Sequence, residues 1–388
     1  MQKINDKLYS WASILEPATL AQAERTASMP FVQPHLALMP DAHLGAGATV
    51  GSVIPTVEAI MPAAVGVDIG CGMIAVRTQF TRDDLGGRSL ADLRRSLEKR
   101  IPLGAGHDNR TVGGTAAPRV AALTEEAGDR LAFYEGLTRV GWELQLGSLG
   151  GGNHFVELTA DESGTLWLFL HSGSRGIGNA IARHHIRVAQ EQCRDRRLPD
   201  RDLAHLTEGT EEFDAYLRDL EWAQHFALAN REEMTDRFLE LVARFLGAAV
   251  EEQERINCHH NFTAREHHLG HDVWLSRKGA IRADAGRPGL VPGSMGTASY
   301  VVSGKGEPAS FESSPHGAGR AYARRAARRT FTLEDMDEAM VGIEYRRGPA
   351  FLDEIPAAYK DIDVVMADAA DLVEVRHTLR QLVNVKGE

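Results

Sequence analysis

Cysteine, positive charge and long apolar runs are all scarce in this chain of 388 residues. Three cysteines, Cys71, Cys193 and Cys258, are too few and too scattered for a disulfide framework, which indicates a reducing compartment. No apolar run approaches the roughly 20 residues of a membrane-spanning helix. The first residues also lack the layout of a signal peptide. We therefore expect a cytoplasmic protein.

The net negative charge limits which macromolecules the protein can bind over a large surface. A net charge of -11 argues against broad, non-specific binding of nucleic acid, although it does not exclude a local basic patch. Hydrophobic and charged contents of 43% and 25% are ordinary for a globular protein. Because no linker or compositional break divides the chain, we expect one complex domain over residues 1–388.

Apolar periodicity, glycine and proline predict the elements that carry the motifs. Strands are expected at 48–56, at 165–170 and at the C-terminus, ending at Val385. A turn-rich segment is expected at 39–47. Helices are expected at 18–27, after Ser89, within 119–145, at 179–192, at 211–247, at 321–329 and near 369–381.

Histidine, by contrast, is abundant, with 16 residues, and a short glycine-rich stretch at 66–73 places Asp68 three residues before Cys71. Glycines give this turn backbone freedom that brings both side chains to one point. A hard oxygen beside a soft sulfur suits a borderline divalent cation such as manganese, zinc or cobalt. A turn aspartate and a buried cysteine are also ordinary structural residues, so these two residues alone do not decide the matter.

Two further glycine-rich segments carry polar residues. Asn153, His154 and Glu157 follow the glycines at 150–152, and a strand delivers His171 directly before the loop at 172–178. A strand, a glycine-rich loop and a helix N-terminus form a phosphate-binding arrangement. The alternative is a tight turn without a ligand.

The last third of the chain adds a histidine and a basic helix. His316 lies in a glycine turn, and Arg320, Arg324, Arg325, Arg328 and Arg329 form the one dense basic cluster. Such a cluster is either a solvated helix face or a polyanion site. The group His267, His268 and His271 resembles a second metal site, but we expect it at the surface, outside any cluster.

Taken together, these segments resemble the RtcB family of GTP-dependent RNA ligases, in its bacterial form, from Asp41 to Lys386. The motifs that carry the resemblance are PDAHLGAG, GVDIGCGM, GGGNHFVE, HSGSRGIG, CHHNF, PGSMGTASY, HGAGR, AYKDID and the terminal VKG. Each motif alone is weak, but their order and spacing are highly specific. The resemblance implies an α/β (α+β) fold of mixed β-sheets surrounded by helices.

The resemblance also implies a site with two manganese ions. Cys71 would be the thiolate that both ions share. Asp68 and His154 would complete one side, and His171 and His260 the other. His260 is preferred to His259 because the ligand of the family directly precedes the asparagine.

The family's nucleophile, which accepts guanylate from GTP, falls on His316. Its guanine-nucleotide contacts fall on Asn153, His154, Phe155, Val156, Glu157, His260, Asn261, Pro292, Gly293, Ser294, Met295, Ser299, His316, Gly317, Ala318, Gly319 and Lys386. The last match replaces the simpler expectation that a lysine three residues from the end lies in a frayed tail.

The sequence departs from the family pattern at four positions: Ala42, Pro315, Ala323 and Ile355. None of them is an implied ligand or the nucleophile. The departures therefore bear on substrate preference or rate.

In the chemistry of the family, guanylate passes from a histidine to an RNA 3′-phosphate, and a 5′-hydroxyl then attacks this activated end. A 2′,3′-cyclic phosphate would first be opened by water. The arginines at 320–329 and Arg175 are candidates for holding RNA phosphates, from charge alone. One rival function is a two-metal phosphoesterase or nuclease, which would need no His316. The other, an RNA-binding scaffold with a structural metal, is disfavoured by the Asp68 ligand. Which RNA is joined, and whether a helper protein takes part, stays open.

Overall fold

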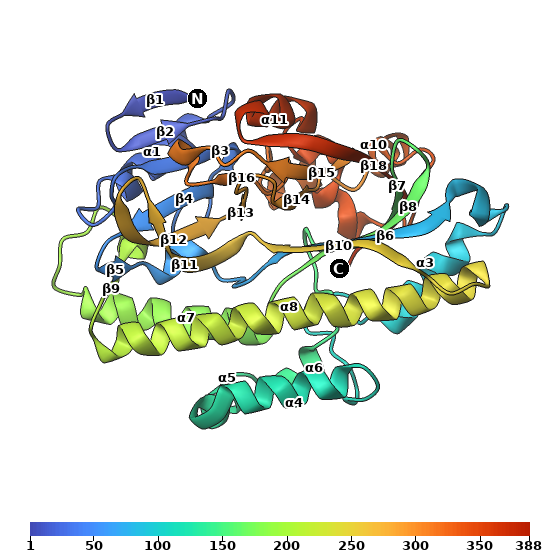
Figure 1. Ribbon diagram of the computed structural model, residues 1–388, viewed down its shortest axis with the longest axis horizontal. Helices are drawn as coiled ribbons and strands as arrows, with labels where there is room; N and C mark the ends of the chain where they lie inside the picture. Colours follow the sequence, from blue (N-terminus) through green and yellow to red (C-terminus); the bar gives the residue numbers. More distant parts are fainter.

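The computed structural model describes residues 1–388 as two large β-sheets with helices around them, the mixed α/β architecture expected from the resemblance (Figure 1). The first sheet has six strands, in the order β1 (Gln2–Asn5), β2 (Leu8–Ser10), β3 (Leu36–His43), β4 (Val50–Thr56), β12 (His271–Lys278) and β11 (Asn261–His268). β2 and β3 are parallel, and the other neighbours are antiparallel.

The second sheet has eight strands. Its order is β10 (Glu252–His259), β6 (Gly72–Thr81), β8 (Thr165–Ser172), β7 (Phe155–Ala160), β18 (Val373–Val385), β15 (Ser299–Gly304) and β14 (Pro288–Val291), with β17 (Glu344–Tyr345) parallel to β18. Two short pairs join β5 (Ala59–Ile60) to β9 (Leu206–Thr207) and β13 (Ala280–Arg282) to β16 (Ser313–Pro315).

Eleven helices surround the two sheets. They are α1 (Pro17–Ala27), α2 (Pro62–Val65), α3 (Leu90–Arg100), α4 (Ala116–Ala127), α5 (Leu131–Leu137), α6 (Trp142–Gln145), α7 (Arg175–Gln192), α8 (Glu211–Leu246), α9 (Arg324–Thr330), α10 (Leu333–Ala339) and α11 (Ile362–Asp368). No helix has the length and apolar character needed to cross a membrane.

One apolar core joins the two sheets, since Met39 and Leu275 of the first sheet share a cluster with Met73 and Phe169 of the second. The long helix α8 connects two further clusters. Its N-terminal half packs with α7 and the α4–α6 group, and its C-terminal half packs with α3 and the second sheet. Figure 1 shows α7 and α8 side by side, with α4 to α6 beyond them. Burial of this apolar surface is the main force that holds the sheets and helices together.

Two sequence predictions about elements are wrong. The expected helix near 369–381 is only a 3-10 turn at Ala369–Asp371, and strand β18 follows from Val373, because Val373, Val375 and Thr378 favour a strand and β7 and β15 pair with it on both sides. The expected turn at 39–47 begins inside strand β3. The pairing of β3 with β4 is interrupted between Leu38 and His43, so this stretch bulges out of the ladder.

Two helix starts also differ from the prediction. The basic helix begins at Arg324, three residues late, because Ala321 and Tyr322 both donate their backbone N–H to the carbonyl oxygen of Ala358. Helix α7 begins at Arg175, four residues early, so the expected glycine loop forms its first turn. The N–H of Ile177 in that turn donates to Gln145 Oε1 at 2.9 Å, and is therefore not free for a phosphate.

Candidate active site

The second sheet places four predicted metal ligands at one of its ends. β6 begins directly after Cys71, and β7 begins directly after His154. His171 lies near the end of β8, and β10 ends one residue before His260. Because these strands are antiparallel neighbours, the starts of two strands lie beside the ends of the other two.

The side chains at this end of the sheet converge on one point. Cys71 Sγ lies 3.3 Å from His154 Nε2 and 3.2 Å from His171 Nε2. His154 Nε2 lies 3.1 Å from Asp68 Oδ2, and His171 Nε2 lies 2.9 Å from His260 Nε2. Cys71, His154 and His171 could hold a metal ion together. All five predicted ligands therefore meet, with Cys71 between the two central histidines.

Each of the three histidines uses its other ring nitrogen for an orienting contact. His154 Nδ1 lies 2.8 Å from the carbonyl oxygen of Leu149, and His171 Nδ1 lies 3.2 Å from that of Asn153. His260 Nδ1 lies 3.1 Å from Asn261 Oδ1. An oxygen acceptor beside Nδ1 favours the tautomer in which Nδ1 carries the proton and donates it in a hydrogen bond. The lone pair of Nε2 is then free for a metal. The rings are thus oriented for ligation before any ion binds.

The neighbouring His259 has a different role in the structure. Its Nδ1 lies 2.8 Å from the carbonyl oxygen of Gly70, away from the cluster. Arg231 of α8, fully buried, donates to the same oxygen at 2.8 Å and to the carbonyl of Ser172 at 3.1 Å. His259 and Arg231 therefore brace the turn that precedes Cys71. Sequence reasoning missed Arg231, whose position within the long helix offers no local signal.

The charge state of the cluster suits a divalent cation. Burial raises the pKa of the Cys71 thiol, and burial lowers the pKa of His171 and His260. Burial also disfavours the Asp68 carboxylate, but the neighbouring His154 and Arg175 hold its pKa at about 2. A cation that displaces the thiol proton would meet one sulfur, three nitrogens and one carboxylate, a mixed set that fits manganese, zinc or cobalt better than magnesium.

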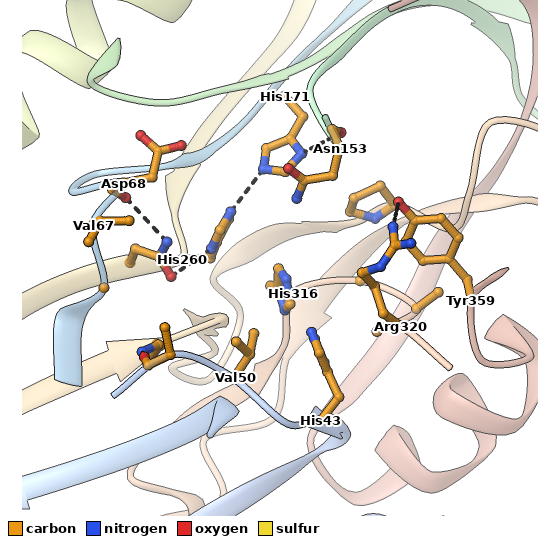
Figure 2. Close-up of a pocket in the computed structure, with 18 of the residues that line it drawn as sticks. His43, Val50, Val67, Asp68, Asn153, His171, His260, His316, Arg320 and Tyr359 are labelled. Atoms are coloured by element: carbon orange, nitrogen blue, oxygen red, sulfur yellow. Dashed lines mark hydrogen bonds between the residues drawn. The ribbon is translucent and has the colours of Figure 1, made fainter. Parts of the chain in front are cut away.

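A cavity of about 510 Å³ opens beside this cluster. Asp68, His171 and His260 line it, and Figure 2 shows His316 facing the same space. Most of the predicted nucleotide contacts also line it: Asn153, Phe155, His260, Asn261, Pro292, Gly293, Ser294, Met295, His316, Gly317, Ala318, Gly319 and Lys386. The cavity therefore brings together distant segments, since His43 and Lys386, 343 positions apart in the sequence, both line it.

Four predicted nucleotide contacts do not line this cavity. His154 lies behind it, within the metal-ligand cluster. Val156 is fully buried in the core beneath the second sheet. Glu157 is also buried, and burial raises its pKa to about 8. Ser299 Oγ accepts from the N–H of Gly293 at 3.4 Å, which shapes the loop that does line the cavity.

His316 has a buried carboxylate behind it. Its Nδ1 lies 2.6 Å from Asp41 Oδ2, an ion-pair distance without the alignment of a hydrogen bond, and its backbone N–H donates to the same oxygen at 3.2 Å. The bulge in β3 aims Asp41 at this point. The ring centroids of His316 and His260 are 4.5 Å apart. Sequence reasoning had Asp41 in a motif but gave it no role.

Lys386 and the basic cluster share one pair of acids. Lys386 Nζ lies 3.0 Å from Glu354 Oε2 and is buried, so the frayed-tail expectation is wrong. Arg320 and Arg324 pair with Glu354, and Arg324 and Arg328 pair with Asp353. Three of the five arginines of the expected polyanion site are therefore paired with acids of the protein itself.

Lys278 also lines the cavity, although sequence reasoning assigned it no role in binding. Its ammonium donates to the carbonyl oxygens of Ala46 and Ala63, the latter at 3.0 Å. Burial lowers its pKa to about 8. Its position, next to the glycine turn at 66, follows from the register of β12 beside β11.

The group of histidines at 267–271 lies at the tip of the β11–β12 hairpin. His267 pairs with Asp272 at 2.7 Å, and the buried His268 pairs with Glu266 at 2.8 Å. His267 and His271 are exposed, as expected, while His268 is not. The three side chains form no potential metal group.

The fold and the site define a class: a metal-dependent enzyme with a soft, histidine-rich cluster and a carboxylate-backed histidine in one cavity. The sequence profile of the family described as "tRNA-splicing ligase RtcB" matches residues 22–387. The chain is 46% identical to the RNA-splicing ligase RtcB of Escherichia coli K12, over 98% of this chain and 97% of the relative.

Two more distant relatives carry the same family name. The tRNA-splicing ligase RtcB of Thermococcus kodakarensis is 30% identical over 90% of this chain and 86% of its own length. The RNA-splicing ligase RtcB of Mycobacterium bovis is 32% identical over 89% and 94%. This chain therefore belongs to the RtcB family of RNA ligases, and the resemblance seen in its motifs is confirmed.

Proposed function

We propose that this protein is a GTP- and manganese-dependent RNA ligase that joins a 3′-phosphate or 2′,3′-cyclic phosphate end to a 5′-hydroxyl end through a guanylylated His316. The observation that carries the proposal is the position of His316. Its Nδ1 faces the buried Asp41 at 2.6 Å, and its ring lies against His260 of the metal-ligand cluster.

Asp68, Cys71, His154, His171 and His260 would hold two manganese ions, with Cys71 shared between them. Bound there, the ions would polarise phosphoryl oxygens and offset the charge that develops during phosphoryl transfer. Nucleotide-contact roles for Asn153, Phe155, the 292–295 loop, the 317–319 turn and Lys386 are supported by their shared cavity.

In the first step, Nε2 of His316 attacks the α-phosphorus of GTP. A P–N bond forms, the bond between the α-phosphorus and the bridging oxygen breaks, and pyrophosphate leaves. The imidazole acquires positive charge as the P–N bond forms, and the Asp41 carboxylate at Nδ1 stabilises that charge.

In the second step, an oxygen of the RNA 3′-phosphate attacks the same phosphorus, so the P–N bond breaks and His316 is released. In the third step, the 5′-hydroxyl oxygen attacks the RNA phosphate, loses its proton, and GMP leaves. A 2′,3′-cyclic end would first be opened by water to the 3′-phosphate.

Incubation with α-labelled GTP and manganese, followed by a denaturing gel, tests the proposal. Wild type should take up label in a bond that is labile in acid and stable in base, as expected for a P–N bond. His316→Ala should take up none while keeping its metals, and should still join ends that already carry the activated guanylate.

Two results would contradict this mechanism. The first is that His316→Ala joins unactivated ends with GTP. The second is that wild type cuts RNA without ever taking label, which would favour a two-metal phosphoesterase that uses the same ligands.

A further inference from the structure

A second basic region lies outside the site described above. Residues 183–201 carry six arginines: Arg183, Arg187, Arg194, Arg196, Arg197 and Arg201. Only Arg194 has a carboxylate partner, in exposed pairs with Glu191 and Asp195. The other five are exposed and have no ion-pair partner, unlike the arginines that pair with Asp353 and Glu354. Residues 183–201 hold six arginines against three acids, Glu191, Asp195 and Asp200, so this segment is positive within a chain of net charge -11.

The helical spacing places part of this patch on one face of α7. Arg183, Arg187 and Gln190 are separated by four and three residues, and therefore lie along one side of the helix, and Arg194 follows two residues after the helix ends. Other residues of α7, including Ile181 and Ala189, are buried in the core that it shares with α8. From Arg183 to Gln190 the side is about 10 Å long, at 1.5 Å per residue.

This face begins in the active-site cavity and continues past it. Arg183, Ile186 and Asp202 line the active-site cavity itself. Arg187, Gln190, Arg194, Arg196 and Arg201 line an adjoining cavity of about 520 Å³. Residues that line the two cavities are neighbours, since Arg183 and Arg187 are one helical turn apart and Arg201 directly precedes Asp202.

Different elements that line the active-site cavity contact different substrates in this proposal. The residues assigned above to the guanine nucleotide come from the loops after β14 and β16, the start of β7 and the C-terminus. α7 reaches the cavity beside α2, against which it packs, and none of its residues is among those nucleotide contacts. The positive face of α7 is therefore available to the other substrate.

We propose that this face of α7, with Arg201 in the following turn, is the track for the RNA backbone outside the catalytic cavity. This inference rests on the RNA ligation proposed above. Arginine binds phosphate oxygens in two-point contacts, without reading the base. A side of about 10 Å, extended beyond the helix by Arg194 and Arg201, is long enough to contact several phosphates of one strand. The track would thus hold RNA several nucleotides away from the ends being joined.

The test compares two doubly substituted proteins of equal charge. Arg187→Ala/Arg201→Ala removes two arginines of the track. Arg139→Ala/Arg218→Ala removes two arginines that are equally exposed and unpaired but lie outside both cavities. Fluorescence anisotropy with a labelled 12-nucleotide RNA bearing a 3′-phosphate, at several salt concentrations, measures affinity. Melting curves verify that both proteins fold.

The track variant should bind the 12-nucleotide RNA at least about fivefold more weakly than the control variant, because exposed charge pairs contribute modestly and additively. Its salt dependence should also fall, by about 0.7 in the slope of log affinity against log salt for each phosphate that the variant no longer binds. A two-nucleotide RNA should show no difference between the variants, because it is too short to reach the track.

Equal affinity and equal salt slope in the two variants, with the 12-nucleotide RNA, would overturn the proposal. A loss of affinity for the two-nucleotide RNA as large as that for the 12-nucleotide RNA would also overturn it, because the arginines would then act at the catalytic cavity. Failure of the proposed ligase function would be seen in a different experiment. Wild type would then take up no label from GTP, whatever the RNA affinities of the two variants.

Discussion

At the scale of single residues, the histidines of the site differ in what their second ring nitrogen contacts. His154 and His171 contact backbone carbonyl oxygens, which fix a neutral tautomer. His316 contacts the carboxylate of Asp41, which stabilises a positive imidazole. Neutral rings suit metal ligation, and a ring that gains charge during attack suits a nucleophile. The group that the second ring nitrogen contacts therefore distinguishes the metal-ligand histidines from the nucleophilic histidine.

Replacement of Asp41 by asparagine should slow self-guanylylation without removing the nucleophile. The amide keeps the shape of the side chain but cannot stabilise the charge that His316 acquires, so we expect a rate loss of about 10²- to 10⁴-fold. The initial rate of labelling with α-labelled GTP measures this. Because Asp41 contacts none of the five metal ligands, metal content should stay at the wild-type level, and a wild-type labelling rate would contradict the role.

Cys71→Ala should lose more metal than any single histidine substitution, because one thiolate would serve both ions. Metal analysis of the purified variants gives the comparison. The hairpin histidines supply the control, since His267→Gln, His268→Gln and His271→Gln should each keep the full metal content. Undiminished metal in Cys71→Ala would exclude the bridging role, and loss of one ion in a hairpin variant would reveal a second site.

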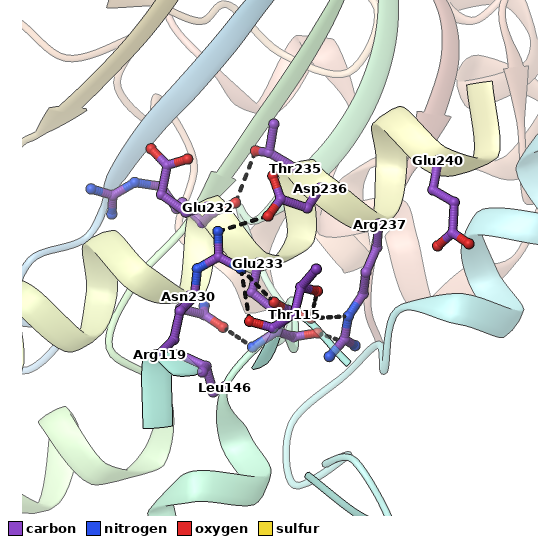
Figure 3. Close-up of polar contacts among 12 residues, drawn as sticks. Thr115, Arg119, Leu146, Asn230, Glu232, Glu233, Thr235, Asp236, Arg237 and Glu240 are labelled. Atoms are coloured by element: carbon purple, nitrogen blue, oxygen red, sulfur yellow. Dashed lines mark hydrogen bonds and ion pairs between the residues drawn. The ribbon is translucent and has the colours of Figure 1, made fainter. Parts of the chain in front are cut away.

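At the scale of elements, helix α8 positions the loop that leads to His154. Asn230 accepts from the N–H of Gly147 at 2.6 Å, and Arg237 donates to the carbonyl oxygen of Gly147 at 3.1 Å. Figure 3 shows the ion pairs behind these contacts, in which the buried Glu233 bonds both Arg237 and Arg119 of α4. One carboxylate on α8 thus ties a peripheral helix and the loop to the same point.

Glu233→Gln should therefore destabilise the protein and weaken metal binding together. Loss of the buried charge leaves the buried Arg237 without its carboxylate partner and Arg119 with Asp236 alone, at a cost of about 3 kcal/mol in the free energy of unfolding. Glu240→Gln, two turns further along α8, is the matched control. Its pairs with Arg100 and Arg244 are exposed, so the cost should be under about 1 kcal/mol. Chemical denaturation and metal analysis give both quantities, and equal losses in the two variants would contradict this account.

Glu354, at the end of the turn at 349–354, should make the free energy of unfolding depend on pH under acidic conditions. Burial disfavours the charged form of Glu354, but Lys386 and Arg324 nearby hold its pKa at about 2, below the ordinary value of 4.5. The native state thus keeps this carboxylate ionised where the unfolded chain would protonate it. Its contribution is complete above about pH 4.5 and is lost as the pH falls toward 2.

Glu354→Gln should consequently lower the melting temperature at pH 7 and lower it less at pH 3. Differential scanning calorimetry of wild type and variant across this range measures the difference. Glu334→Gln, an exposed residue on α10 with one distant pair to Arg347, should show no such trend. A difference between Glu354→Gln and wild type that stays constant from pH 7 to pH 3 would contradict the assignment.

At the scale of the whole molecule, the metal cluster and the apolar cores are distinct. The three largest cores contain 29, 22 and 20 buried residues and extend over both sheets and the helices. The cluster lies at one end of the second sheet, at the crossing from β10 to β11 between the two sheets. The fold therefore does not depend on the ions in the way that a zinc finger does.

Removal of metal with a chelator should accordingly abolish labelling by GTP and leave the far-ultraviolet circular dichroism unchanged. The melting temperature should fall by a few degrees, since a ligand present at about 100 times its dissociation constant stabilises the native state by about 2.7 kcal/mol. Addition of manganese should restore both quantities. Complete unfolding on chelation would show that the ions hold the sheets together.

The sequence by itself determined the family, the mixed α/β class, the five candidate ligands and the candidate nucleophile. These residues lie in short glycine-rich motifs whose order along the chain is specific, so each signal is local. The choice of His260 over its neighbour also came from one adjacent residue, Asn261, and the structure directs His260 to the cluster and His259 away from it.

Only the tertiary structure decided what lies beside these residues. Asp41 and His316 are 275 positions apart, and no periodicity or composition links them. The pairing of Arg324 with Glu354, and of β18 with two neighbouring strands, likewise depends on contacts between distant segments. Local pattern determines which face of an element is apolar, but the packing of that face determines which buried charges meet. The electrostatics of the site therefore could not be predicted from the motifs that identified it.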